Sequence, residues 1–195
     1  GKELKNITIK QSENLGIAFV HQELNLFNDL KVYENIFLQK EYTTKFGCLD
    51  KKKMIQEAER LFQELGVDID PTQQVSKLKT SQKQLLEISK ALFFKAKLLI
   101  LDEPTTSLNN DEVAHLFDIV NNLKKKETSF IFISHKMPEI FRLSDRYTVF
   151  RNGEFIGAGN IKDTTPEDVT RMMVGEKYSD QDVYEKRSLG DIILE

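Results

Sequence analysis

The chain has 195 residues, of which 39% are hydrophobic and 30% charged, a composition typical of a globular domain. Its longest apolar runs, for example 98–101 and 130–133, reach four residues, far short of the roughly 20 that a membrane-spanning helix needs. The formal net charge of -3 excludes a chain-wide positive field that would recruit nucleic acid, so we expect no nucleic-acid partner.

The single cysteine, Cys48, excludes an internal disulfide and a zinc site built from cysteines, so a reducing compartment such as the cytosol is expected. The chain begins at Gly1 rather than at Met, and no charged and then apolar leader follows. We therefore expect a truncated start rather than a targeting signal.

The first predicted element is a buried strand at 15–20, which ends in polar residues. A short helix is predicted at 32–38. A longer helix begins after Asp50 as its N-cap and ends at Gly66 as its C-cap, so the region 32–95 is expected to be mainly helical. The apolar residues that recur at helical spacing in the longer helix are Met54, Ala58, Leu61, Phe62 and Leu65.

Helices and strands alternate in the second half of the chain. A helix with an apolar face through Leu92 leads into a buried strand at 98–101, and a helix over 113–123 leads into a strand at 129–133. The two helices are predicted to begin near Thr80 or Ser81 and after Asn109 or Asn110. This alternation indicates an α/β fold.

Shorter elements are predicted toward the end of the chain. Residues 138–143 are expected to be helical, and strands at 147–150 and 154–157 are expected to form a hairpin. The segment 176–187 is highly charged and poor in aliphatic residues, which predicts a linker, and 192–194 would open another element.

Polar residues follow each of the three predicted core strands. Gln22 follows the first strand, Asp102 and Glu103 follow the second, and His135 follows the third. In open α/β sheets the ligand binds at the carboxyl ends of the strands, so these side chains are expected to converge. An Asp-Glu pair at that edge suits metal-nucleotide chemistry: one carboxylate holds Mg²⁺ through water and the other orients the attacking water. The alternative is that the acids are solvated strand caps and the histidine is a hydrogen-bonded loop residue.

Three segments resemble motifs of ABC-type ATPases. The string GIAFVHQELNLF resembles their Q-loop, LLILDEPTTSL resembles Walker B with the D-loop, and FIFISHK resembles the histidine switch. The resemblance extends over residues 1–175. It implies an α/β fold of the P-loop NTPase class, an ABC ATPase core with an inserted helical subdomain, truncated at the N-terminus.

Further segments resemble the branch of this family that imports simple sugars. VHQELNL followed by VYENIFL is similar to that branch, and VDIDPTQQVSKLKTSQKQLLEISKAL is most similar to its galactose and methylgalactoside import ATPases. Members of this branch carry two nucleotide-binding domains in one polypeptide, and this chain resembles the first. The tail strings RMMVGEKY and GDIILE resemble the link into the second.

The resemblance also implies a division of the chain into four segments. Residues 1–31 would start the truncated ATPase core and carry the Q-loop. Residues 32–95 would form the helical subdomain with the signature segment. Residues 96–175 would return to the core with Walker B, the D-loop and the histidine switch, and 176–195 would link to a second nucleotide-binding domain.

The same resemblance implies roles for the converging residues toward two cofactors, ATP and Mg²⁺. Gln22 would approach Mg²⁺ and the attacking water, and would relay the nucleotide state to the membrane partner. Asp102 would support Mg²⁺ and Glu103 would be the catalytic base. His135 would contact the γ-phosphate, and Asn109 would lie in the D-loop that meets the opposite domain.

The signature position is implied to cap ATP bound on the partner domain, through backbone N–H groups and the positive end of the following helix. Its residues are Leu78, Lys79, Thr80, Ser81 and Gln82. Lys79 stands where the family usually has Ser, which removes a hydroxyl donor, although an ammonium group can meet a phosphate as a point charge. The alternative is a tolerated surface change in a degenerate site.

No G-x-x-x-x-G-K-[ST] phosphate loop occurs in the sequence. We therefore expect this chain by itself to bind ATP weakly and to hydrolyse it poorly. We also expect unpaired strand edges, bare apolar surface and poor solubility, because the family's phosphate-loop strand lies inside the central sheet.

The implied partners are membrane permease subunits, a second nucleotide-binding domain of the same chain or of a dimer partner, and, indirectly, a periplasmic or lipid-anchored sugar-binding protein. The implied location is the cytoplasmic face of the bacterial membrane. The segment 23–37 would receive the membrane subunit through Leu24, Leu26, Phe27 and Tyr33, with core packing as the rival interpretation. Alternative functions are a non-transport ABC ATPase and a catalytically inactive binding or structural module.

Two weaker signals have simpler interpretations. Gly153, Gly157 and Gly159 have the wrong spacing for a dinucleotide loop and are expected to serve turn geometry at the hairpin. His115 lies off the apolar face of its predicted helix, so we expect it to be solvated.

Overall fold

The chain divides into two compact units, residues 1–135 (unit 1) and 136–195 (unit 2). The computed structural model describes residues 7–94 and 96–175. The linker predicted at 176–187 and the element predicted at 192–194 therefore lie outside the described residues. Among the described residues, no helix combines the length and the apolar character needed to cross a membrane.

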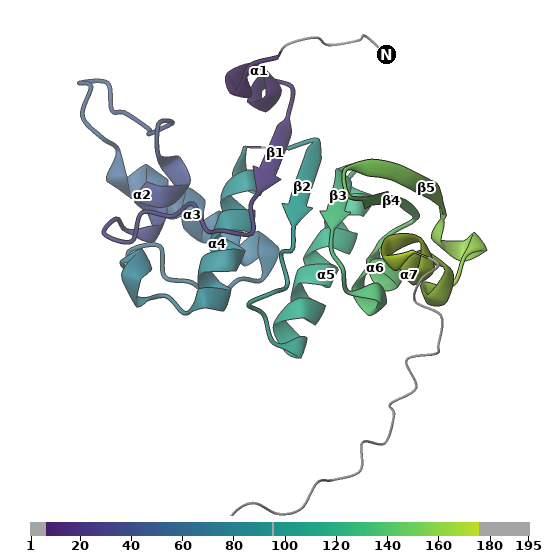
Figure 1. Cartoon of the computed structure of the whole chain (residues 1–195). Helices are drawn as coiled ribbons and strands as arrows, with labels where there is room; N and C mark the ends of the chain where they lie inside the picture. The colour runs from purple at the N-terminus through teal and green to yellow at the C-terminus, as the bar shows by residue number, and fades with distance from the viewer. Residues whose placement is uncertain (1–6, 95, 176–195) are drawn as a thin grey trace, which may run out of the picture. The chain divides into compact units, whose positions relative to one another are not determined.

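Within the described part of unit 1, three parallel strands form the central sheet in the order β1-β2-β3 (Figure 1). The strands are β1 (Ile17–Val20), β2 (Leu98–Asp102) and β3 (Ser129–Ile133). All three coincide with predicted strands, and the parallel α/β arrangement confirms the predicted fold class. Parallel pairing requires a long crossover between neighbouring strands, and the helices of the chain supply it.

The helices of unit 1 account for the regions between these strands. They are α1 (Ile9–Asn14), α2 (Val32–Phe37), α3 (Lys51–Leu65), the 3₁₀ turn η1 (Val75–Lys77), α4 (Thr80–Phe93) and α5 (Asn110–Lys125). Helices α2 to α5 were expected from apolar periodicity. Helix α1 was not, because it buries no residue; a capping box in which Thr8 and Gln11 exchange hydrogen bonds marks its start.

Predicted cap residues end up at the helix ends. Asp50 accepts a hydrogen bond from the Lys53 backbone N–H at 3.0 Å at the start of α3, and Gly66 ends that helix with a φ of 67°. Asn109, rather than Asn110, caps α5. His115 on α5 packs against Gly66, the C-cap of α3, because a Cβ at Gly66 would lie 3.3 Å from the His115 ring.

The prediction that His115 is solvated is therefore wrong. Its Nε2 is buried and has no hydrogen-bond partner among the described residues. The apolar periodicity of α5 correctly places His115 off the face that packs on the sheet. The end of α3 at Gly66 covers that position instead.

The largest core lies among the helices between β1 and β2. Helices α2, α3 and α4 pack together there, and the buried members of this cluster include Val32, Ile36, Phe37, Met54, Phe62 and Leu86. The expectation that residues 32–95 are mainly helical is confirmed, whereas their division into a separate helical subdomain stays a prediction. The segment boundaries predicted at 31, 95 and 175 stay predictions.

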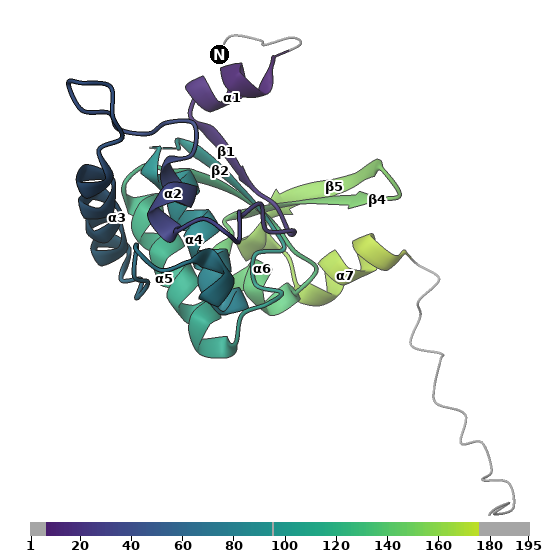
Figure 2. The ribbon, with the colours of Figure 1, turned by 90° about the vertical axis from the view of Figure 1, so that its left-hand side faces the viewer.

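A second core lies between the sheet and helices α4 and α5, which cover one of its faces (Figures 1 and 2). Leu99 and Leu101 are fully buried on that face, and Phe117 of α5 packs edge-on against Phe132 of β3. The opposite face leaves Phe19, Ile131 and Ile133 more than 40% exposed. All-parallel sheets normally bury both faces, so this second face is an uncovered apolar surface within the described residues.

The described part of unit 2, residues 136–175, contains the predicted hairpin and three helical segments. Its elements are α6 (Met137–Leu143), β4 (Arg146–Arg151), β5 (Glu154–Asn160), the 3₁₀ turn η2 (Ile161–Asp163) and α7 (Pro166–Val174). The hairpin is antiparallel, with an irregularity between Val149 and Phe150. Helix α7 was not predicted, although Thr165 as N-cap and Pro166 at the first turn are ordinary start signals.

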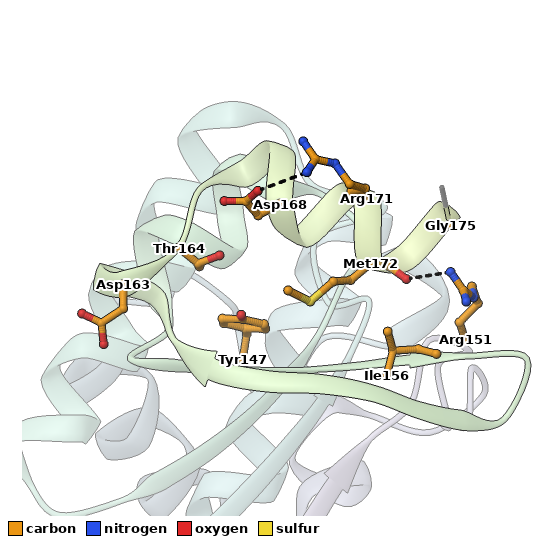
Figure 3. Close-up of a pocket in the computed structure, with 9 residues that line it drawn as sticks. All are labelled: Tyr147, Arg151, Ile156, Asp163, Thr164, Asp168, Arg171, Met172 and Gly175. Carbon is orange, nitrogen blue, oxygen red and sulfur yellow. Dashed lines mark hydrogen bonds and ion pairs between the residues drawn. The ribbon is translucent and has the colours of Figure 1, made fainter. Parts of the chain in front are cut away.

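The three glycines of the hairpin do not share one role. Gly153 lies in the turn with a φ of 81°, as expected, but Gly157 and Gly159 lie inside β5. A Cβ at Gly157 would lie 3.3 Å from the Met172 sulfur, and one at Gly159 would lie 3.0 Å from the Tyr147 ring. The absence of a side chain on these two glycines therefore leaves room on β5 for Met172 and Tyr147, which line the cavity of about 600 Å³ shown in Figure 3.

Candidate active site

The parallel register brings the ends of three strands to one edge of the sheet. Val20 pairs with Leu101, and Asp102 pairs with Ile133. Gln22 therefore follows two residues beyond the end of β1, at the same edge where Glu103 follows β2 and His135 follows β3. The strand-end residues singled out from the sequence lie at this edge, and none lies at the opposite end of the sheet.

Glu103 and His135 are in direct contact. Nδ1 of His135 lies 2.7 Å from Oε1 of Glu103, and the His135 backbone N–H donates to the same oxygen at 3.2 Å. The Glu103 backbone N–H donates to the Ile133 carbonyl at 2.9 Å. The pair therefore joins the loops that leave β2 and β3.

The two side chains differ in exposure. That of Glu103 is 16% exposed and that of His135 is 70% exposed. The second carboxylate oxygen of Glu103, Oε2, is buried and has no hydrogen-bond partner among the described residues. Such an oxygen is costly to leave unpaired, so it is suited to accept a hydrogen bond from a water or ligand that enters the site.

Glu103 also has an unusual backbone. Its φ is 47°, in the left-handed region that residues other than glycine seldom adopt. The turn that follows fixes this geometry: the Thr106 hydroxyl donates to the Glu103 carbonyl at 3.0 Å, and Pro104 is buried. Strain of this kind persists where surrounding contacts over-determine it, and it is common at functional sites.

The donor set at this edge fits a magnesium-nucleotide. Asp102 is half-buried at the end of β2 beside Glu103, whose Oε2 lacks a partner, and Gln22 is exposed at the end of β1. No group of three or more His, Cys, Asp or Glu side chains that could hold a metal occurs among residues 7–94 and 96–175. Mg²⁺ commonly takes one or two carboxylates and completes its shell with phosphates and water, so these residues match such a site.

The signature segment forms the start of helix α4. Leu78 is buried, Lys79 is the N-cap, and Thr80 and Ser81 begin the helix. Gln82 accepts a hydrogen bond from the Lys79 backbone N–H at 3.1 Å. The first turn of a helix presents unpaired backbone N–H groups and a partial positive charge, as an anion site requires.

Asn109 caps α5 through its side-chain oxygen. That oxygen accepts hydrogen bonds from the backbone N–H groups of Asp111 and Glu112, both at 3.0 Å, and the Glu112 carboxylate accepts from the Asn109 N–H at 2.9 Å. This N–H lowers the pKa of Glu112 most, and the Ser81 hydroxyl and the Lys79 charge lower that pKa further.

Glu112 therefore joins the predicted D-loop residue to the predicted signature segment, and sequence reasoning missed it. An Asn followed three residues later by Glu is a capping-box signal, so the sequence carried the indication. The carboxylate that interacts with both Asn109 and Ser81 is that of Glu112, and not that of Glu103.

Two side chains, Asn35 of α2 and Glu87 of α4, interact with the backbone of the segment that follows Gln22. Asn35, which is fully buried, accepts from the Phe27 backbone N–H at 2.8 Å and donates to the Phe27 carbonyl at 3.1 Å. Burial raises the pKa of Glu87 on α4, against the opposing effects of the Lys90 charge, the Asn25 backbone N–H and the His21 charge.

The predicted partner surface in this segment is corrected at one position. Phe27 is 56% exposed, and Leu24 and Leu26 are half-buried. Tyr33 is only 3% exposed and belongs to the helical core. Core packing, the rival interpretation, holds for Tyr33.

Comparisons with known proteins show the family and the fold of this chain. A family model described as ABC transporter matches residues 1–106. The chain is 42% identical over 196 residues to the ribose import ATP-binding protein RbsA of Clostridium perfringens, covering 100% of this chain and 39% of that protein. It is 43% identical over 179 residues to the galactose/methyl galactoside import ATP-binding protein MglA of Pasteurella multocida, covering 92% of this chain and 35% of that protein.

The chain thus spans well under half the length of these relatives. Among solved structures, a nucleotide-free ATP-binding cassette from an ABC transporter matches with a TM-score of 0.72 at 23% identity, covering 90% of this chain and 75% of that one. The ADP conformation of MJ1267, an ATP-binding cassette of an ABC transporter, matches with a TM-score of 0.68 at 22% identity, covering 90% and 71%. At these identities the likeness shows the fold.

Proposed function

Because this chain belongs to the ABC transporter family, we propose that it is part of the ATP-hydrolysing subunit of a bacterial importer for a simple sugar. The observation that carries the proposal is the Glu103–His135 contact at the carboxyl edge of the parallel sheet. Enzymes that hydrolyse ATP use a residue that orients the attacking water beside the phosphates, and the buried, unpaired Oε2 of Glu103 supports that role here.

The sugar is proposed as a class. Sequence motifs favour galactose and methylgalactoside, whereas the relatives named above include a ribose importer at 42% identity and a galactose importer at 43%. We therefore extend the proposal to pentoses and hexoses of this kind.

In the proposed mechanism, Glu103 is the base that orients and polarises the attacking water. His135 holds Oε1 of Glu103 at 2.7 Å, which leaves the buried Oε2 to accept the hydrogen bond from water. The exposed ring of His135 would turn its remaining nitrogen toward the γ-phosphate. Asp102 and Gln22 would hold Mg²⁺, which supplies neutralisation of phosphate charge when bound.

A second nucleotide-binding domain completes this proposal. The start of α4, with Lys79 as N-cap, would face ATP held by that domain, and Asn109 would meet it from the D-loop. The Lys79 ammonium would act there as a point charge in place of a hydroxyl donor.

The membrane partner is proposed to dock near Phe27. Its side chain is 56% exposed while Asn35 fixes its backbone, so an exposed apolar residue is presented in a defined position. The partner would be a permease subunit, the location would be the cytoplasmic face of the membrane, and a sugar-binding protein would act indirectly through the permease.

The test is ATP turnover by the full-length protein reconstituted with its membrane subunits in vesicles, with ribose-loaded or galactose-loaded binding protein inside. We expect turnover to rise with one of these sugars, and Glu103→Gln to abolish the rise while Glu59→Gln, an exposed position on α3, keeps it. Stimulation by ribosomes or DNA instead would support a non-transport ABC ATPase. No turnover under any condition would support a binding or structural module.

A further inference from the structure

The loop between α2 and α3, residues 39–50, is held by its own backbone hydrogen bonds. The Thr44 N–H donates to the Cys48 carbonyl at 2.8 Å, and the Asp50 N–H donates to the Tyr42 carbonyl at 2.8 Å. The loop extends away from the helices of unit 1 in both views (Figures 1 and 2). Its tip is therefore a defined protrusion of that unit.

Large apolar side chains face solvent on this loop. Phe46 is 93% exposed, more than any other large apolar residue among those described, and Leu49 is 53% exposed. Single exposed apolar residues are common on protein surfaces, so exposure alone means little. Here the two lie on one short protrusion, which makes them available together to a partner.

The sequence on both sides of Phe46 is basic. Five lysines and two acidic residues lie in the stretch from Lys40 to Lys53, in a chain whose net charge is -3. Lys45, Lys51 and Lys52 are exposed, and no ion pair involves them in the part of the chain that the structure describes. An apolar tip flanked by free ammonium groups matches a surface that is apolar inside and negatively charged outside.

We propose that the α2–α3 loop binds an anionic lipid bilayer, with Phe46 at the boundary between headgroups and acyl chains and the lysines among the headgroup phosphates. A protein partner is less favoured, because the apolar residues stand on a protruding tip and this loop lines neither the cavity beside Tyr147 nor the one beside Glu64. A bilayer requires no complementary groove. This binding is independent of the proposed ATP site.

The sequence contains no tryptophan, so one placed at the tip is a unique fluorescent probe. The test is the emission of the Phe46→Trp chain with vesicles of phosphatidylcholine alone or mixed with phosphatidylglycerol. We expect a blue shift with the mixed vesicles, and affinity roughly tenfold or more above that for phosphatidylcholine alone. Phe155→Trp, at a 63% exposed position on β5, is the control and should show no shift.

Charge is tested in the same background. Lys51→Gln combined with Lys52→Gln should weaken binding by roughly tenfold, whereas Lys10→Gln combined with Lys77→Gln should not. Flotation of the unsubstituted chain with the mixed vesicles checks that the probe does not create the binding. The proposal is overturned if the emission of the Phe46→Trp chain does not shift, if it shifts equally with phosphatidylcholine alone, or if the shift requires purified membrane subunits, which would indicate a protein contact.

Discussion

Nδ1 of His135 lies 2.7 Å from Oε1 of Glu103, although the two residues are 32 positions apart in the sequence. The parallel pairing of β2 with β3 makes this contact possible, since Asp102 and Ile133 are register partners and each residue of the pair follows one of these strands. The contact therefore results from the fold of unit 1, and it is the geometric basis for the proposed chemistry.

Replacing His135 with Ala should impair turnover without impairing stability. The side chain is 70% exposed, so little packing is lost, but Glu103 loses the partner that fixes its carboxylate. We expect ATP turnover of the full-length protein to fall about 100-fold or more and the thermal unfolding midpoint to stay unchanged. A large drop in the unfolding midpoint would show that the histidine acts mainly in stability.

Replacing Glu87 with Gln should stabilise the fold at neutral pH. Burial raises the pKa of Glu87, so the folded state binds its proton more tightly than the unfolded state does. The ionised carboxylate is therefore destabilising above the folded pKa, and stability is recovered as pH falls through the folded pKa toward the unfolded value.

The measurement is thermal unfolding of both proteins at a series of pH values. The excess stability of Glu87→Gln over the unsubstituted protein should be largest at neutral pH and should shrink on acidification. A variant that is less stable at neutral pH would show that the Asn25 and Lys90 interactions outweigh the cost of burial.

Replacing Asn109 with Ala should destabilise α5. Its side chain accepts two backbone hydrogen bonds at 3.0 Å, and such caps contribute about 1 kcal/mol. Denaturant unfolding should show this loss, while Asn110→Ala, one residue inside the helix, should leave stability nearly unchanged. Equal effects at both positions would contradict the assignment of the cap.

Replacing Gly66 with Ala should cost more than the same change at Gly47. Both glycines have positive φ, 67° and 79°, so both substitutions carry backbone strain of about 1 kcal/mol. Only at Gly66 would the new Cβ approach another side chain, the His115 ring at 3.3 Å, whereas nothing lies within 4 Å at Gly47. Chemical denaturation should show a larger loss in the free energy of unfolding for Gly66→Ala than for Gly47→Ala. Equal losses would show that the His115 ring moves aside without cost.

Much of unit 1 could be predicted because its signals are local. The apolar run at 98–101, the N-cap Asp50 and the C-cap Gly66 each specify a strand or a helix end from neighbouring residues. Helix α1 was not predicted because it buries no residue, so its sequence has no apolar periodicity that would indicate a helix. The strand-end residues could be placed at one edge because parallel strands share a direction.

Other features depended on which elements meet in space. The packing of His115 against Gly66 needs the end of α3 beside α5, and the interaction of Glu112 with Ser81 needs the starts of α4 and α5 side by side. Neither the spacing nor the periodicity of residues in the sequence predicts which helices contact one another. The burial of Tyr33 likewise follows from how α2 packs against α3 and α4.

Glu103 is proposed to activate water at the carboxyl edge of the sheet. The most direct measurement is Mg²⁺-ATP binding and hydrolysis by the full-length protein carrying Glu103→Gln, with Glu59→Gln as the matched control. We expect Glu103→Gln to keep ATP binding and to lose hydrolysis by about 100-fold or more, with both activities retained in the control. Hydrolysis by Glu103→Gln at the rate of the control would contradict this role of Glu103.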